Sequence, residues 1–349
     1  MSANHRSNGK RMTHKDVAER AGVSVATVSY VLNHGPRPVA SKTRSKVEAA
    51  IAELGYYPNE LARSLRLQQS STIGLILPSI LNPVFAEIAH AIESVCSEAG
   101  FLVLLCNSER QHAREEHFVQ MLRAKQVDGV VIIPHDQPLT LVAPLRQAHI
   151  PFVVLEHDLP GVHCIAIDEL QGGRLATQHL IGLGHRRIAL IRRKATSALS
   201  TQRLIGYQQA LAAAGIRFDA NLVVDCEAGQ AAGERTMQQL LALARPPTAV
   251  FTHNDVLAMG ALHAIRQAGL SVPGDISVVG YDDITSAAYF FPPLTTVRSP
   301  KAEMGARASR MILQLVQQKD HPPATTITLP VELVIRLSTA APPPVVSSA

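Results

Sequence analysis

The chain has 349 residues, of which 46% are hydrophobic, and its formal net charge at pH 7 is +5. This length suits a small unit joined to a larger body of two lobes better than a single domain. The sequence contains no apolar run of about eighteen residues, and residues 1–12 lack the apolar segment of a secretory signal, so we expect neither a transmembrane nor an exported protein.

After a disordered tail at residues 1–12, the next twenty residues predict two short helices around a tight turn. Thr13 can cap the first helix, and Asp16 can return a hydrogen bond to the Thr13 amide. Gly22 ends this helix, as a tight turn requires. Ser24 can then cap a second helix over Val25–Leu32. The pattern is typical of a helix-turn-helix.

A third helix is predicted from a Ser41 cap to Leu54, followed by Gly55 as its C′ residue. The apolar side of the second helix, around Val28, faces inward, which leaves its outer face and N-terminal end free to meet base edges. A small helical bundle without a role in DNA binding is the alternative. The DNA contacts expected in this unit are Thr13, Ser24, Val25, Ala26, Thr27, Ser29, Tyr30 and Asn33.

The charge distribution favours DNA over the plain bundle. Residues 1–70 contain eleven Lys and Arg against five Asp and Glu, a net charge of +6, and the rest has twenty-two against twenty-three, a net charge of −1. A run of positive charge is often only a solvated face. Because this excess is confined to a predicted helix-turn-helix, it indicates a surface that neutralises DNA phosphates.

Two runs in this region, VAERAGVSVATVSYVLN and ELGYYPNELARSLR, resemble the lactose-repressor (LacI/GalR) family of bacterial transcriptional regulators. The resemblance continues over nearly the whole chain after the first dozen residues. It implies a hinge helix over residues 59–65 that folds when paired hinges enter the minor groove, with Leu65 as the wedge that unstacks a base step. Without the resemblance, Leu61 and Leu65 are only the apolar stripe of a short linker helix. The hinge contacts implied are Asn59, Ala62, Arg63, Leu65 and Arg66.

From Thr72 the chain alternates apolar runs with helical stretches. Short continuous apolar strands separated by helices predict buried parallel sheets with helices on both faces. More than seven such units suit two doubly wound α/β lobes. The expected strands are Ile73–Leu77, Leu102–Leu105, Val130–Ile133, Phe152–Leu155, Ile188–Ile191, Leu222–Val224, Ala249–Phe251 and Ile276–Val279.

The family resemblance supplies what periodicity does not, namely where the chain passes between the lobes. It implies a periplasmic-binding-protein-like core with crossings near residues 160, 292 and 324. The expected divisions are a helix-turn-helix domain at 13–57, a hinge and linker at 58–69, a core at 70–340 and a disordered tail at 341–349. Within the core, the first lobe takes residues 70–160 and 293–323, and the second takes 161–292 and 324–340.

Ligands of such sheets bind beyond the carboxyl ends of the strands, here in a cleft between the lobes. Six residues follow strands in this way. The polar ones also have a structural interpretation: Asn82 and Asn254 as helix caps, Asp168 as a turn brace and Arg203 as an ion-pair partner. Phe85 could provide an apolar platform against a ligand ring. The resemblance implies effector contacts at Arg203, Asn254 and Asp282 in particular. The full set of expected effector residues is Asn82, Phe85, Asp168, Arg203, Asn254 and Asp282.

The chemistry of the cleft favours a sugar or sugar derivative, because an arginine, an amide and a carboxylate give directional bonds to hydroxyls. Some residues depart from the pattern common among sugar-binding relatives. Glu156 and His157 replace an Asp-Arg pair, and no aromatic residue lies between residues 226 and 232. A nucleoside or purine, a sugar acid and a phosphorylated sugar therefore stay open.

An enzyme on a Rossmann-like body is the rival function, since this fold hosts many activities. The sequence has no dinucleotide or phosphate-loop glycine motif and no nucleophile elbow. His112 and His117 do not share a helical face, and the four cysteines are widely spaced in apolar segments, so we expect no metal, cofactor or disulfide.

We therefore predict a cytoplasmic repressor that binds a near-palindromic operator in double-stranded DNA and responds to a small-molecule effector. Paired half-sites and paired hinges imply a homodimer. The tail APPPVVSSA lacks a leucine heptad, which argues against a tetramer.

Overall fold

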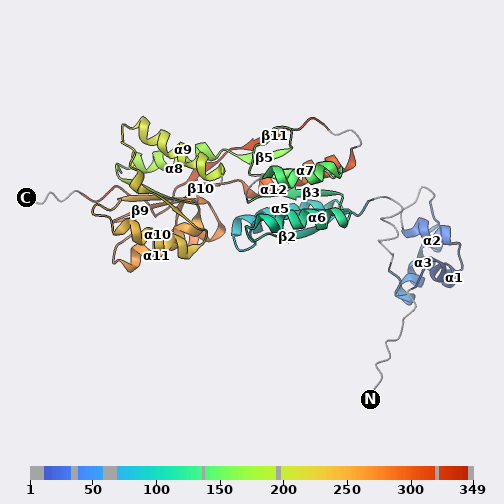
Figure 1. The fold of residues 1–349 in the computed structure, drawn as a ribbon. Helices are drawn as coiled ribbons and strands as arrows, with labels where there is room; N and C mark the ends of the chain where they lie inside the picture. The colour runs from blue at the N-terminus through green and yellow to red at the C-terminus, as the bar shows by residue number, and fades with distance from the viewer. Residues whose placement is uncertain are drawn as a thin grey trace, which may run out of the picture. The chain divides into compact units, whose positions relative to one another are not determined.

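The computed structural model describes residues 12–32, 38–57, 69–135, 138–193, 198–318 and 322–344. The chain divides into two compact units, residues 1–70 and residues 71–349 (Figure 1). Among the described residues, no helix is long and apolar enough to cross a membrane. Most residues of the tails expected at 1–12 and 341–349 lie outside the described residues. Pro342 is described, and its Cδ atom would lie 3.5 Å from a Cβ atom placed on Gly184.

The N-terminal unit contains three helices, α1 (His14–Ala21), α2 (Val25–Leu32) and α3 (Ser41–Leu54). The predicted capping box is present, with the Thr13 amide donating to Asp16 at 2.7 Å. Gly22 has a φ of 65°, a conformation that glycine adopts without steric cost and that lets the chain turn between α1 and α2.

Two further helix ends can be compared with their predictions. Ser24 caps α2, because its Oγ accepts from the Thr27 amide at 3.1 Å. The predicted Ser41 cap is wrong: Ala40 occupies the cap position without a side-chain bond, and Ser41 is the first helical residue. The interior of the unit is a small cluster that includes Val17, Val28, Val47 and Tyr56.

The first sheet of the larger unit has the strand order β11-β5-β4-β3-β1-β2, and all of its pairs are parallel. Helices α5 and α12 pack together on one face, and α6 and α7 pack on the other. Its elements are β1 (Thr72–Leu77), α5 (Pro83–Glu98), β2 (Leu102–Asn107), α6 (His112–Ala124), β3 (Gly129–Ile132), α7 (Pro138–Gln147), β4 (Phe152–Leu155), β5 (Cys164–Ile167), α12 (Lys301–Gln317) and β11 (Thr326–Leu329).

The second sheet has the order β12-β10-β9-β8-β6-β7, parallel except for β12, which runs antiparallel to β10. Helices α8 and α9 pack together, as do α10 and α11. The elements are α8 (Glu169–Gly182), β6 (Ile188–Arg193), α9 (Ala198–Ala213), η1 (Ala220–Leu222), β7 (Val223–Cys226), α10 (Gln230–Leu241), β8 (Ala249–Thr252), α11 (Asp255–Gln267), β9 (Ser277–Asp282), η2 (Thr285–Tyr289), β10 (Thr295–Arg298) and β12 (Glu332–Val334).

The expected places of the lobe crossings are wrong by a few residues. Each crossing comes after a strand and not before it, so β5 and β11 belong to the first sheet and β10 to the second. These strands are only four residues long. Such short apolar runs look alike in sequence. Tertiary packing decides which neighbouring strand each one pairs with, so the sequence does not show to which sheet it belongs.

Close contact between α8 and α9 follows from two glycines. A Cβ atom on Gly173 would lie 2.2 Å from the Arg203 carbonyl oxygen, and one on Gly206 would lie 2.1 Å from the Leu170 carbonyl oxygen. Because neither position has room for a side chain, the two helix backbones touch. This contact sets the position of Arg203 relative to the start of α8.

Candidate functional site

Arg203 is held by a fork of hydrogen bonds. Its Nε and Nη2 atoms donate to the two carboxylate oxygens of Glu169 at 2.5 and 3.1 Å, and its Nη1 donates to the His253 carbonyl oxygen. The guanidinium carbon also lies 3.4 Å from the centroid of the Tyr281 ring. Burial opposes the charge of Arg203, but the charge and hydrogen bonds of Glu169, together with the electrostatic effects of Tyr281 and Asp282, outweigh burial and raise the pKa of Arg203. The guanidinium is therefore a fixed cation whose remaining N–H groups are free to donate.

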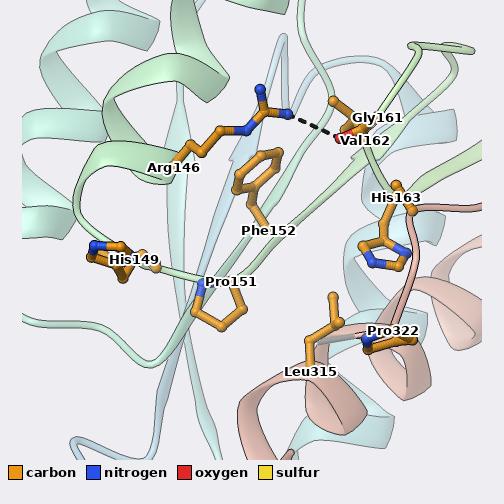
Figure 2. A pocket seen from close by; sticks show the side chains of 11 residues that line it. Arg146, His149, Pro151, Phe152, Gly161, Val162, His163, Leu315 and Pro322 are labelled. Carbon is orange, nitrogen blue, oxygen red and sulfur yellow. Dashed lines mark hydrogen bonds between the residues drawn. The ribbon is translucent and has the colours of Figure 1, made fainter. Parts of the chain in front are cut away.

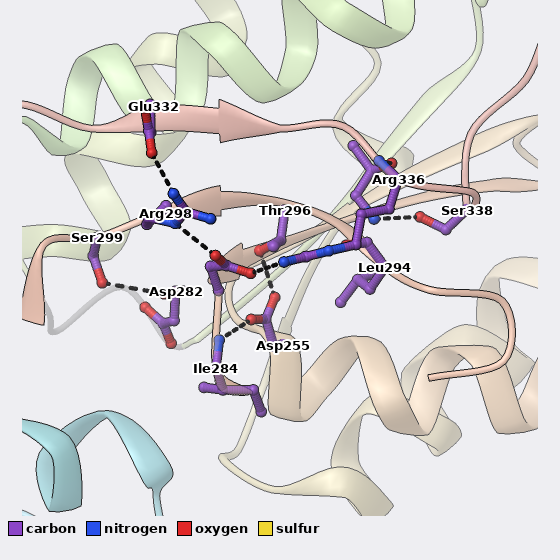
Figure 3. A network of polar contacts seen from close by, with 12 residues as sticks. Asp255, Asp282, Ile284, Leu294, Thr296, Arg298, Ser299, Glu332, Arg336 and Ser338 are labelled. Atoms are coloured by element: carbon purple, nitrogen blue, oxygen red, sulfur yellow. Dashed lines mark hydrogen bonds and ion pairs between the residues drawn. The ribbon is translucent and has the colours of Figure 1, made fainter. Parts of the chain in front are cut away.

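Asp282, the last residue of β9, is buried next to this arginine. Burial raises the pKa of its carboxyl to about 7, although the charges of Arg203 and Lys301 oppose that shift. Among the described residues, the carboxyl group forms no hydrogen bond or ion pair. The bond from Ser299 goes to the Asp282 backbone oxygen (Figure 3), as does the bond from Lys301. The residue is only 7% exposed, and a largely desolvated carboxyl with no donor among the described residues is suited to accept a hydrogen bond from a ligand.

A network of polar contacts fixes the backbone around Asp282 (Figure 3). The Asp255 carboxylate accepts from Thr296 Oγ1 at 2.6 Å and from the Ile284 amide at 2.8 Å. Asp283 pairs with Arg298 at 2.7 Å and with Arg336 at 2.6 Å. Burial alone would raise the pKa of Asp283, yet these two arginines hold it below its ordinary value. This polar network could not be predicted from the sequence, because its residues come from four separate segments of the chain.

Lys301, the first residue of α12, connects this region to the first lobe. Its Nζ donates to the backbone oxygens of Asp282 and Asp283 and lies 3.6 Å from the Glu87 carboxylate on α5. Only 5% of Lys301 is exposed. The ammonium therefore bridges the two lobes at the carboxyl end of β9.

Three of the expected effector residues act as helix caps. The side chains of Asn82, Asp168 and Asn254 accept from backbone amides at the starts of α5, α8 and α11. Asn254 is buried at the start of α11, just after β8, whereas Asp168 is exposed. Phe85 lies in the apolar core of the first lobe, only 5% exposed, so it does not offer a free platform for a ring.

Four residues that were not among the predicted contacts lie, like Arg203 and Asp282, at or after the carboxyl ends of strands, where the effector cleft is expected. Arg110 and Glu156 follow β2 and β4 of the first lobe, while Arg193 ends β6 and His253 follows β8 of the second. Arg193 donates to His135 Nδ1 across the lobes at 3.3 Å. Burial, followed by the charges of Arg203 and Arg193, holds the pKa of His253 well below its ordinary value. Their position after strands was the only sequence signal, except for Glu156, which with His157 also stands where sugar-binding relatives have an Asp-Arg pair.

Backbone strain also gathers at the cleft. Arg110, Glu156 and Asp282 have φ angles of 59°, 62° and 103°, in the region that side chains other than glycine rarely adopt. Such strain persists where packing enforces it and is concentrated at functional sites. The cleft residues are thus held in place at some cost to stability.

A separate cavity of about 300 Å³ lies at the opposite end of the first sheet, before β4, β5 and β11 (Figure 2). Arg146 lines this cavity, and its Nη2 atom donates to the Gly161 carbonyl oxygen at 2.9 Å. Phe152, His163 and Pro322 line other sides. Because ligands of parallel sheets bind beyond the carboxyl ends of strands, this cavity is not the expected site.

On the N-terminal unit, the outer side of α2 is accessible. Val25 is 45% exposed, Ser24 and Ala26 are exposed, and Ser29 and Tyr30 are half-buried. This face has the residues predicted to meet base edges. Of the other predicted DNA contacts, Thr13 is exposed and Thr27 is half-buried, while Asn33, Asn59, Ala62, Arg63, Leu65 and Arg66 lie outside the described residues. Within the part of the chain that the structure describes, no group of three or more His, Cys, Asp or Glu side chains could hold a metal ion.

Comparison with known proteins relates both units to regulators. Residues 13–59 match the family described as bacterial regulatory proteins, lacI family, and residues 177–339 match the periplasmic binding protein-like domain. The HTH-type transcriptional repressor PurR of Photobacterium profundum is 38% identical over 329 residues, which cover 93% of this chain and 98% of that protein.

Two solved structures are similar over nearly the whole chain. The lac repressor dimer bound to operator and the anti-inducer ONPF has a TM-score of 0.85 at 35% identity, covering 95% of this chain and 100% of that chain. The transcriptional regulator CelR–cellobiose complex has a TM-score of 0.72 at 34% identity, covering 94% of this chain and 100% of that chain.

Proposed function

Because this chain belongs to the lacI family of bacterial regulatory proteins, and is a DNA-binding repressor under allosteric control, we propose that its effector is a sugar or sugar derivative bound beside Asp282. The family binds operator DNA as dimers, and its members are repressors and not enzymes. The body supplies the effector cleft and the N-terminal unit supplies the DNA contacts.

The carboxyl of Asp282, a residue only 7% exposed, carries this proposal, because nothing among the described residues donates a hydrogen bond to it. A ligand hydroxyl can donate to it, and the free N–H groups of Arg203 can donate to a ligand oxygen nearby. Both groups are fixed before the ligand arrives, Arg203 by Glu169 and Asp282 by the polar network around Asp255 and Asp283. Preorganised donors and acceptors of this kind suit a polyol.

For the DNA-binding unit, we propose that α2 enters the major groove and that residues 59–65 form the hinge helix. Val25 and Ala26 offer apolar contacts, for instance to a thymine methyl group, and Tyr30 offers one polar contact. Direct readout is then modest, and DNA deformability at the hinge contributes the rest of the specificity.

Coupling between the two activities would pass through the lobes. A ligand that contacts Asp282 on the second lobe and residues of the first favours one relative position of the lobes, and Lys301 transmits a change at Asp282 to α12. By linkage, the ligand changes operator affinity by the same factor as operator changes ligand affinity.

A purine or nucleoside is the second candidate effector, favoured by the similarity over the whole length to repressors named PurR. Both candidates would use the Asp282 carboxyl as an acceptor. With a sugar the cleft would recognise hydroxyl groups, whereas with a purine it would recognise a heterocycle. Binding measurements with a panel of ligands distinguish the two.

Thermal unfolding of the full chain against sugars, sugar acids, sugar phosphates, nucleosides and purines tests the proposal. A ligand at a hundred times its Kd stabilises the folded state by about 2.7 kcal/mol. Asp282→Asn should lose this stabilisation, while Asp225→Asn, an exposed carboxylate paired with Arg192, should keep it. Equal stabilisation of both variants would place the ligand elsewhere.

A further inference from the structure

We infer that the effector carries an anionic group, a phosphate or a carboxylate, that binds between Arg110 of the first lobe and Arg193 of the second. This inference rests on the proposed function, because it specifies the ligand of the same cleft. It divides the cleft into a hydroxyl-binding end at Asp282 and an anion-binding end at the two arginines.

The two arginines lie near one another although they come from different lobes. Arg110 is in the loop between β2 and α6, and Arg193 ends β6. Both are half-buried. Burial, together with the charge of Arg193, lowers the pKa of Arg110 to about 10. Two cations that are close enough for one to lower the pKa of the other repel one another unless a negative charge lies near both.

Within the described residues, no carboxylate forms an ion pair with either guanidinium. Among the described residues, the buried Nε atom of Arg110 has no hydrogen-bond partner, and the Arg193 side chain bonds to His135 Nδ1 and to no carboxylate. The neighbouring arginines differ in this respect, because Arg192 pairs with Asp225 at 2.5 Å and Arg203 pairs with Glu169 at 2.5 Å. Arg110 and Arg193 therefore have positive charge available for a ligand.

His253 and Glu156, at the same end of the cleft, also leave the positive charge of the two arginines available for an anion. The Nδ1 atom of His253 is buried, also without a hydrogen-bond partner, in a residue that is only 5% exposed. Glu156 acts on the charge of both arginines, and Glu227 acts on Arg193 alone. Burial and the charges of Glu169 and Asp282 raise the pKa of Glu156 to about 7. At neutral pH this carboxyl is only partly ionised, so it does not cancel two guanidinium charges.

The chemical class of ligand follows from both ends of the cleft. Guanidinium groups bind phosphate and carboxylate through charge-assisted hydrogen bonds, which are stronger than bonds to neutral acceptors. Asp282 and Arg203 suit hydroxyls, as argued above. A sugar phosphate or a sugar acid satisfies all four residues, whereas a neutral sugar leaves Arg110 and Arg193 without a counter-charge.

Matched ligand pairs test this inference on the full chain. Isothermal titration calorimetry at constant ionic strength would compare ribose with ribose 5-phosphate, and glucose with glucose 6-phosphate and gluconate. Within the pair that fits the cleft, we expect the anionic member to bind at least about ten-fold more tightly than the neutral sugar. Inorganic phosphate alone should bind much more weakly than the sugar phosphate, because it has no hydroxyl end.

Substitutions of Arg110 and Arg193 test whether these two residues cause the tighter binding of the anionic ligand. Arg110→Gln and Arg193→Gln should remove most of the anionic preference, and Arg114→Gln, which alters a more exposed pair with Glu109, should retain it. Without ligand, Arg110→Gln should unfold at the same or a higher temperature than the wild type, because repulsion is relieved. A lower unfolding temperature would indicate a structural ion pair and would overturn the inference.

The outcomes separate this inference from the proposed function. If a neutral sugar binds as tightly as its anionic derivative and Asp282→Asn loses it, the anionic ligand is wrong and the sugar cleft stands. If the anionic preference persists in both arginine variants, the anion lies elsewhere. If no sugar of either kind binds, both proposals fail.

Discussion

The Lys301 ammonium of the first lobe donates a hydrogen bond to the Asp282 backbone oxygen at the end of the second lobe's β9. The same ammonium donates to the Asp283 oxygen at 3.0 Å and lies near Glu87 on α5. One buried side chain thus touches the strand end that presents the candidate ligand-binding carboxyl and the two helices that pack on the first sheet. If effector binding shifts the end of β9, Lys301 therefore transmits that shift directly to α5 and α12.

Replacing Lys301 by methionine should weaken this link while keeping most of the apolar stem. Two backbone oxygens would lose a charged donor, and Glu87 would lose its partner. We expect a loss of about 1–3 kcal/mol in the free energy of unfolding. Urea unfolding measures it, with the exposed Lys125→Met as control. If Lys301→Met were as stable as the control, the bridge would contribute nothing to the fold.

Gly173 should tolerate no side chain, because a Cβ atom there would lie 2.2 Å from the Arg203 carbonyl oxygen. Gly173→Ala should separate α8 from α9, disturb the Arg203–Glu169 fork and destabilise the protein by several kcal/mol, on the order of the cost of severe core overpacking. Gly182→Ala, in the same helix, is the matched control because nothing lies within 4 Å of its Cβ position. This second variant should be neutral or more stable by up to about 1 kcal/mol. Similar unfolding midpoints for the two variants would contradict the close contact.

Glu156 should make stability depend on pH. Its pKa is about 7 in the folded protein against an ordinary value of 4.5, so folding favours the protonated carboxyl. The stability that this group contributes is present below pH 4.5 and is lost as the pH rises through 7. Glu156→Gln should therefore gain stability relative to the wild type between about pH 5 and pH 8. Urea midpoints across this range measure the gain, and Glu98→Gln, an exposed carboxylate at the end of α5, is the reference. A constant difference across the range would mean that Glu156 is ionised throughout.

Leu65 should matter for DNA and not for the effector. Leu65→Ala removes the proposed wedge, so operator affinity should fall by about ten-fold or more while ligand binding is unchanged. Operator fragments selected from random duplexes, titrated at fixed salt, provide the measurement. Unchanged operator affinity would exclude the hinge assignment, and a parallel loss of ligand binding would indicate a folding defect.

Local features were predicted well from the sequence, because their causes are local. Thr13 and Asp16 form the expected capping box, and Gly22 takes the left-handed conformation that the turn requires. The positions of Arg203, Asn254 and Asp282 near the cleft also follow from one rule, since the carboxyl ends of parallel strands share an edge.

Features that depend on distant segments were not predicted. The sequence does not show that Glu169 is the partner of Arg203, thirty-four residues away, or that Asp255 holds Thr296. Nor does an apolar run reveal which sheet takes a four-residue strand such as β10. Arg110 and Glu156 have positive φ angles that only the surrounding packing enforces, so no residue type marked them in advance.

The interleaving of the two lobes has a consequence for synthesis on the ribosome. The DNA-binding helices emerge first, whereas the first lobe lacks α12 until residue 317 has been made, and α12 covers the Ile88 and Ile92 side of α5. A nascent chain released before Lys301 would thus bear a finished DNA-binding unit and an uncovered apolar helix face. Exposed surface of that kind directs unfinished chains to chaperones and proteases. The order of assembly thereby keeps fragments that bind DNA but lack a complete sensor from accumulating.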